Sequence, residues 1–238
     1  MKYIVQLSSI LFLGTIIFSS CAVFTKGYSE YRSAQRFHKK QDYHQAALYA
    51  SKSLKLNAKN KKALNLFERS YHLAIEDHES NISDLEKIED DSKWPRLYYE
   101  YDKLQNLSDE LISLKPIVNL ENENAPALLR YEMNLPNQDY HKELDRIGPL
   151  AAEYDYNKGL EYRKKKDKES QKIAAKAFKS AQQFVPNYKN SKELYDETRA
   201  SALLTLLILP FDGNNNLVNY IRDQIMMIQT NKPKEFLQ

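Results

Sequence analysis

The fold is decided by the stretch 27–59, which reads GYSEYRSAQRFHKKQDYHQAALYASKSLKLNAK. In its first half, apolar and aromatic residues recur at every third position, the spacing of one helix face. These residues are Tyr28, Tyr31, Ala34 and Phe37. After an interruption at Gln41-Asp42 the helical spacing returns, and Asp42 is well placed to cap the second helix. The second set is Tyr43, Ala46, Ala47, Ala50 and Leu54. The stretch therefore predicts two helices, 27–40 and 43 to about 57, joined by a short turn.

A third helix is expected from Lys61 to His78, with the apolar stripe Leu64, Phe67, Tyr71 and Ile75. The first two helices resemble a tetratricopeptide repeat, a helix-turn-helix unit of about 34 residues, and the third would be the first half of the next repeat. The match is carried by the small residue Ala34, the aromatic Phe37, and the second-helix residues Tyr43, Ala46, Ala50 and Ser53. The resemblance implies a stack of helical hairpins over residues 21–80 that binds other proteins.

A second stretch of this kind lies within 149–202, from Leu150 to Tyr188. Gly159 and Tyr162 correspond to Ala34 and Phe37. In the next helix Ala174, Phe178 and Ala181 correspond to Ala46, Ala50 and Ser53. The turn at 164–170 is expected to be about three residues longer than the standard turn of the repeat. Asn190 or Ser191 then caps a closing helix, 192 to about 202.

The middle region, 81–148, is less regular. Ser83-x-x-Glu86 is a capping-box pattern that predicts the start of a short helix, and Trp94-Pro95 predicts the start of a longer one. That longer helix is expected to end at Lys115-Pro116, because proline interrupts helical hydrogen bonding. Residues 119–137 are interpreted as a loop and 139–146 as a helix. Gly148-Pro149 is expected to interrupt the chain before the second hairpin.

The composition agrees with a helical protein. Only five of the 238 residues are glycine, and there is little β-type alternation, so we predict an all-α fold class. The formal charge is +3, and the short basic runs Lys39-Lys40 and 164–166 are scattered. We therefore expect no nucleic-acid partner.

The N-terminal segment 1–20 has the organisation of a secretory signal peptide. Lys2 is followed by an apolar stretch, 4–18, and then by Ser19, Ser20 and Cys21, which is the only cysteine of the chain. This resembles the lipobox of bacterial lipoproteins, in which the cysteine becomes the acylated first residue of the mature protein. The resemblance implies lipidation of Cys21 and a membrane anchor in the cell envelope, expected in the outer membrane and facing the periplasm or the cell surface. The alternative is an uncleaved signal anchor, since residues 4–24 are about long enough to span a bilayer.

The C-terminal segment, 203–238, has a different character. The run LLTLLILPF at 203–211 is continuously apolar and is followed by Asp212-Gly213, which predicts a buried strand and a turn. Residues 217–229 have the pattern of an amphipathic helix. This β-α segment is too short to complete a parallel sheet. It is interpreted as the start of a truncated α/β domain, with pairing to a partner strand and extension of the preceding helix as alternatives.

No catalytic motif is recognisable. The five histidines lack a set of metal-ligand spacings and are interpreted as surface or turn residues, so neither a metal nor a cofactor is expected. Aromatic residues near Trp94 suggest a sugar- or peptide-binding groove, but Tyr98 and Tyr101 fit core packing better, which leaves Tyr99 as the surface candidate. Candidate partner-binding residues are Tyr31, Gln35, Tyr99, Tyr156 and Arg163.

The sequence favours a non-enzymatic, lipid-anchored scaffold that binds an envelope protein through its helices. One alternative is the helical part of a larger envelope enzyme or enzyme regulator with a truncated C-terminal domain. Another is a structural element that adds its 203–211 segment to a partner.

Overall fold

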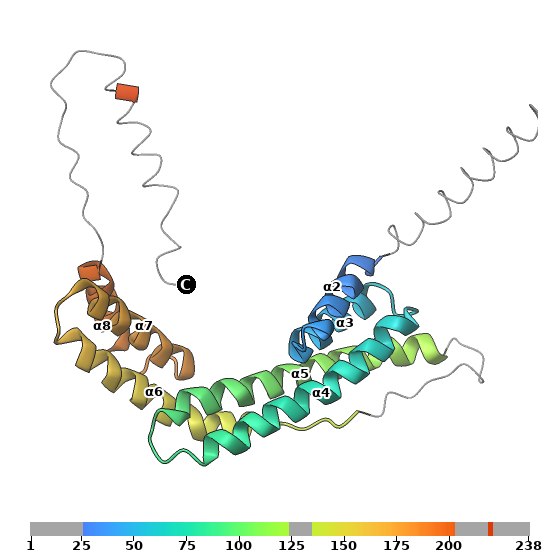
Figure 1. Cartoon of the computed structure of the whole chain (residues 1–238), viewed down its shortest axis with the longest axis horizontal. Helices are drawn as coiled ribbons and strands as arrows, with labels where there is room; N and C mark the ends of the chain where they lie inside the picture. Colours follow the sequence, from blue (N-terminus) through green and yellow to red (C-terminus); the bar gives the residue numbers. More distant parts are fainter. Residues whose placement is uncertain (1–25, 124–134, 203–218, 221–238) are drawn as a thin grey trace, which may run out of the picture. The chain divides into compact units, whose positions relative to one another are not determined.

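The computed structural model describes residues 26–123, 135–202 and 219–220 of the chain. Within these ranges the regular structure is entirely helical, which confirms the predicted all-α class. The long helices run in the order α2 (Tyr28–Lys39), α3 (Tyr43–Leu56), α4 (Lys61–Glu86), α5 (Lys93–Glu123), α6 (His141–Arg163), α7 (Lys168–Phe184) and α8 (Ser191–Ala202). Figure 1 shows them in chain order. Contacts divide the chain into a first unit that ends at Arg146 and a second that begins at Ile147.

Helices α2 and α3 form the hairpin expected from the sequence. The carboxylate of Asp42 accepts a hydrogen bond from the backbone N–H of Gln45 at 3.1 Å, so Asp42 is the N-cap of α3 as predicted. Asn60 caps α4 in the same way through the N–H of Ala63. Helix α3 contacts α2, α4 and α5, while α2 also contacts α4. In the first unit each helix thus packs mainly on its neighbours in the chain, α2 on α3, α3 on α4 and α4 on α5, and α3 also packs on α5.

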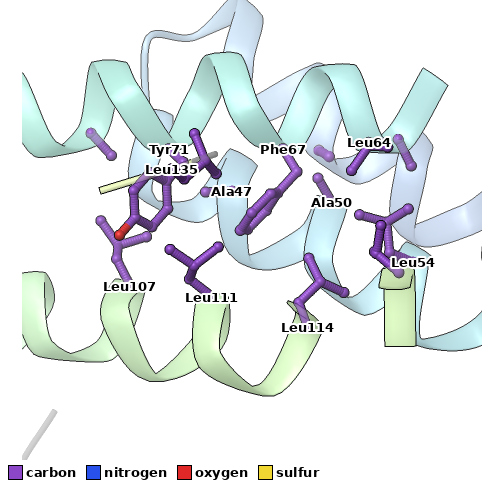
Figure 2. Packing of buried hydrophobic residues seen from close by; sticks show 14 residues of the cluster. Ala47, Ala50, Leu54, Leu64, Phe67, Tyr71, Leu107, Leu111, Leu114 and Leu135 are labelled. Atoms are coloured by element: carbon purple, nitrogen blue, oxygen red, sulfur yellow. The ribbon is translucent and has the colours of Figure 1, made fainter. Parts of the chain in front are cut away.

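The core of the first unit lies where α3, α4 and α5 meet. Figure 2 shows Phe67 and Tyr71 of α4 among small residues of α3 and leucines of α5. The neighbours labelled there include Ala47, Ala50, Leu107, Leu111 and Leu114, all fully buried. The small alanine side chains of α3 let α4 and α5 pack closely against it. Burial of these side chains removes apolar surface from water. The hydroxyl of Tyr71 donates a hydrogen bond to the carbonyl of Pro136 at 2.8 Å, so the segment 135–140 is held against α4.

Two proline-based predictions were wrong. Helix α5 passes through Pro116 and continues to Glu123, so residues 119–123 are helical and not part of a loop. Proline removes the hydrogen bond to the carbonyl four residues earlier, which belongs to Ile112. The Ile112 side chain is 52% exposed, so water can reach this turn, while buried Leu114 and Val118 hold the helix on its other face. Residues 135–140 have no regular secondary structure, and 124–134 lie outside the described residues.

The second wrong prediction concerns Gly148-Pro149. This pair does not interrupt the helix, because α6 runs through it from His141 to Arg163. Ile147, Ala151 and Ala152 on either side are fully buried, and their packing stabilises the helix across the missing hydrogen bond. The predicted helix start at Ser83 was also wrong. Helix α4 continues to Glu86, with Ile82 and Leu85 buried on the stripe begun by its earlier residues.

In the second unit, α7 is three residues longer than α3, 17 against 14, whereas its turn spans only residues 164–167. The extra length expected in the turn is therefore in the helix. By burial pattern, Ala174 takes the place of Ala50 and Phe178 that of Leu54, one helical turn away from the pairing inferred from the sequence.

The predicted signal peptide and most of the C-terminal strand-helix segment lie outside the described residues. Only Asn219 and Tyr220 of that segment are described, and both are helical. Within 26–123 and 135–202 no helix combines the length and apolar character that a membrane crossing requires.

Candidate functional site

The predicted partner-binding residues of the first unit lie on two different helices, α2 and α5. Tyr31 packs partly against the core, and its hydroxyl accepts a hydrogen bond from the side-chain amide of Gln35 at 2.9 Å. Both residues belong to α2. Tyr99 belongs to α5, is 42% exposed, and meets the Tyr98 ring edge to face. Tyr31 and Gln35 therefore lie together, whereas Tyr99 lies apart from them on α5.

The two predicted residues of the second unit have structural partners. The Tyr156 ring packs on Phe178, and its hydroxyl donates to the Asn190 side chain at 2.6 Å. Arg163 forms an ion pair with Glu197 of α8 at 2.7 Å. Tyr156 thus connects α6 to α7 and to Asn190, and Arg163 connects α6 to α8. A protein partner that binds either side chain would have to compete with these contacts. Cys21, the predicted lipidation residue, lies outside the described residues.

A chain of polar side chains crosses the first unit, and sequence reasoning missed it. His44 of α3 approaches His78 of α4 with Nδ1 3.1 Å from Nε2. His78 Nδ1 lies 2.7 Å from the carboxylate of Glu100 on α5, and Glu100 also pairs with Lys103 at 2.8 Å. His78 is 6% exposed, so its interpretation as a surface or turn residue was wrong.

The hydrogen-bond chemistry of this His44–His78–Glu100 chain follows from its acceptor end. A carboxylate only accepts, so His78 carries a proton on Nδ1 and donates it to Glu100. In a neutral imidazole Nε2 is then the acceptor, and His44 donates to it from Nδ1. The three helices are thus joined by directional bonds in a region where unpaired polar atoms would be costly.

The environment shifts the pKa values of both ends of this chain. Burial lowers the pKa of His44 to about 4, and the nearby Lys103 and the repulsion between two protonated imidazoles at His44 and His78 act in the same direction, opposed by Asp42 and Glu100. Burial alone would raise the pKa of Glu100, but the hydrogen bonds from His78 and Lys103 outweigh it and lower that pKa to about 2. Both shifts favour the neutral imidazole of His44 and the ionised carboxylate of Glu100 near neutral pH.

We predict a specific pH dependence of stability from His44. The unfolded chain binds a proton at His44 below pH 6.5, whereas the folded chain does so only near pH 4, so the free energy of unfolding falls as the pH drops through this interval. The Glu100 contribution is lost at lower pH, from 4.5 towards 2. Between pH 7 and pH 5, His44 should account for about 1 kcal/mol, after allowance for its partial exposure.

Urea unfolding followed by the fluorescence of Trp94, the only tryptophan, measures this effect. The variant His44→Asn keeps a polar group near Nδ1 and should lose less stability between pH 7 and pH 5 than the wild type. His72→Asn removes an exposed imidazole of α4 and is the matched control. An identical pH slope in wild type and His44→Asn would contradict the assignment.

Other polar groups of the described residues offer little for catalysis. His38 Nδ1 lies 3.0 Å from Ser70 Oγ, but Ser70 is fully buried and cannot meet a substrate. In the second unit, burial raises the pKa of Asp155 to about 6, with Lys158 and Ser180 opposing the shift. Within the described part of the chain, no three histidine, cysteine or acidic side chains gather as a metal site would require.

A shallow pocket with a volume of about 260 Å³ opens on the surface of the first unit. Tyr101 and Tyr140 form part of its wall, with their ring centroids 6.2 Å apart. The acidic residues Glu79 and Glu86 line it as well. Tyr101 is thus half-buried at a small depression.

The comparisons with known proteins supply no relative. No model of a protein family matches this chain, and neither does any curated protein or any solved structure. The function must therefore be argued from the sequence and the helical units alone.

Proposed function

We propose that this chain is a non-enzymatic lipoprotein of the bacterial cell envelope that holds a protein partner at a membrane through its helices. The observation that carries the proposal is the position of Cys21. The only cysteine ends the apolar N-terminal stretch and stands directly after two small residues, six residues before the first helical unit. A lipid on Cys21 would tether that unit, with the outer membrane as the expected location.

The arrangement of the first unit supports the interaction role. Its helices contact one another as stacked hairpins do, α2 with α4 and α3 with α5. Such stacks bury one face of each unit and leave the other layer as an extended binding surface. By analogy with tetratricopeptide units, the layer of α2 and α4 would face the partner. Gln35 and Tyr31 then belong to the binding surface, whereas Tyr99 does not.

Site-specific photo-crosslinking tests this assignment in cells. A photoreactive phenylalanine replaces Gln35 in one full-length chain and Tyr99 in another, and crosslinked products are identified in the envelope fraction. We expect the Gln35 position to yield a discrete protein product, and the Tyr99 position to yield none.

The same photoreactive chains carrying Cys21→Ala are the control for the tether, and the Gln35 product should decrease when the anchor is lost. A product only from Tyr99 would support the interaction role but move the binding surface to the layer of α3 and α5. No product from either position in an anchored, folded chain would contradict the scaffold proposal.

A further inference from the structure

The shallow pocket of the first unit has two carboxylates and an apolar, aromatic wall. Glu79 and Glu86 of α4 both line it, and so does Ile82, which lies between them in the chain. The two glutamates are seven residues apart, so they stand on one helix face about 10.5 Å apart along the axis. Tyr101 and Tyr140 complete the wall with their rings. The pocket thus offers a carboxylate at two points that are two helical turns apart.

Each glutamate has a different tyrosine beside it. Burial raises the pKa of Tyr140, and the charge of Glu79 adds to this shift. Burial likewise raises the pKa of Tyr101, and there Glu86 contributes most among the charged neighbours. The wall therefore holds one carboxylate and one phenol at each of two positions.

The hydroxyl of Tyr140 is open to the pocket. Tyr140 is only 6% exposed, and its backbone N–H donates to Gln105 Oε1 at 2.7 Å. Its hydroxyl has no hydrogen-bond partner among the described residues, yet none of their fully buried side-chain oxygens or nitrogens lacks one. The hydroxyl is therefore reached by solvent, and the pocket is the depression that this side chain lines. A phenol held in this way can donate to a ligand or accept from it.

The described residues do not neutralise the two carboxylates. Neither Glu79 nor Glu86 has an ion-pair partner in the described part of the chain. Arg146, the cation that acts on the tyrosine beside Glu86, is itself paired with Glu143 at 2.7 Å. From Glu76 to Glu86, α4 carries five acidic residues and neither lysine nor arginine. A cationic ligand would compensate this charge, whereas an anion would meet repulsion from both carboxylates.

We propose that this pocket binds a short aliphatic diamine, with one ammonium group at Glu79, the other at Glu86 and the methylene chain along Ile82. Two charge-assisted hydrogen bonds of about 2.8 Å each leave roughly 5 Å between the two nitrogen atoms, which a short carbon chain spans. The tyrosine rings attract ammonium groups through their faces, and the Tyr140 hydroxyl can accept a further hydrogen bond. This inference depends neither on the proposed anchor nor on a protein partner.

Isothermal titration calorimetry on the full chain, purified in detergent, tests the diamine site. The probes are 1,4-diaminobutane and 1-aminobutane at neutral pH and low ionic strength. Both carboxylates are exposed, so the second ion pair should make the diamine bind about fivefold more tightly than the monoamine. About 0.5 M salt should weaken the diamine binding.

The monoamine also distinguishes the source of the ammonium group, because it reproduces the end of a lysine side chain. Equal affinities for the two probes would indicate a site for one basic side chain of a protein partner and would overturn the diamine assignment. Absence of saturable diamine binding to the folded chain would overturn it as well.

Charge-matched variants locate the site. Glu79→Gln and Glu86→Gln should each reduce the affinity for the diamine to about that for the monoamine. Glu76→Gln makes the same charge change on the same helix at a residue outside the pocket wall, and it should preserve the binding. Tyr140→Phe removes only the unpartnered hydroxyl and should weaken the binding about threefold.

Thermal unfolding without diamine, followed by circular dichroism, shows that each variant is folded. A loss in Glu76→Gln as large as that in Glu79→Gln would mean general attraction to an acidic surface and would overturn the site. Undiminished diamine binding in folded Glu79→Gln and Glu86→Gln chains would overturn it too.

Discussion

Replacing Gly159 by alanine should lower the stability of the second unit by about 2 kcal/mol, although alanine normally stabilises a helix interior. A Cβ at this position would lie 2.6 to 2.8 Å from three atoms of the Phe178 ring, which is less than any real contact allows. Phe178 is fully buried, packs against Tyr156, and has no room to withdraw. The added methyl group must therefore separate α6 from α7. We expect the midpoint of thermal unfolding by circular dichroism to fall by about 10 °C.

The variant Phe178→Leu identifies the cause. Leucine lacks the outer ring atoms that the new methyl group would meet, so Gly159→Ala combined with Phe178→Leu should lose less stability than the sum of the two single variants. Trp94 lies in the first unit and reports unfolding there separately. Additive losses, or a Gly159→Ala chain as stable as the wild type, would contradict the close crossing of α6 and α7.

Local signals of the sequence were sufficient for the first hairpin. The threefold spacing from Tyr28 to Phe37 and the cap at Asp42 depend on residues within one or two turns, and both predictions are confirmed. A capping bond or an apolar stripe is determined by neighbours in the chain, so it can be recognised without knowledge of tertiary contacts.

Helix ends that depend on distant packing were predicted less well. Pro116 and Pro149 are ordinary helix breakers by local rules, yet both lie inside helices whose flanking residues are buried. The capping-box pattern at Ser83 was likewise overridden by the burial of Ile82 and Leu85. In each case the apolar face continued beyond the local stop signal, and tertiary packing determined the outcome.

The His44–His78–Glu100 chain could not be predicted from sequence patterns, because its three residues come from three different helices. One signal was present: His78 continues the apolar stripe of α4, where a histidine must be buried and hydrogen-bonded. The identity of its partners, His44 and Glu100, follows only from the packing of α3 and α5 against α4. The candidate partner-binding residues stay predictions, and the separation of Tyr31 and Gln35 on α2 from Tyr99 on α5 could not be foreseen without the packing of these helices.

Cys21→Ala should abolish lipidation completely, which is the largest effect expected of any substitution in the chain. Acylation requires the cysteine thiol, and the chain has no other cysteine to substitute for it. If the proposed lipoprotein processing holds, removal of residues 1–20 should fail in this variant as well. The helical units contain no part of this site in their described residues, so the fold of the variant should be unchanged by circular dichroism.

The intact mass of the membrane-extracted chain, together with incorporation of a palmitate analogue, tests the tether most directly. We expect the wild-type chain to lack residues 1–20, to carry acyl groups on Cys21 and to incorporate the label, whereas Cys21→Ala incorporates none. An unlabelled wild-type chain that retains Met1 to Ser20 in the membrane would contradict the lipoprotein proposal and establish a signal anchor in its place.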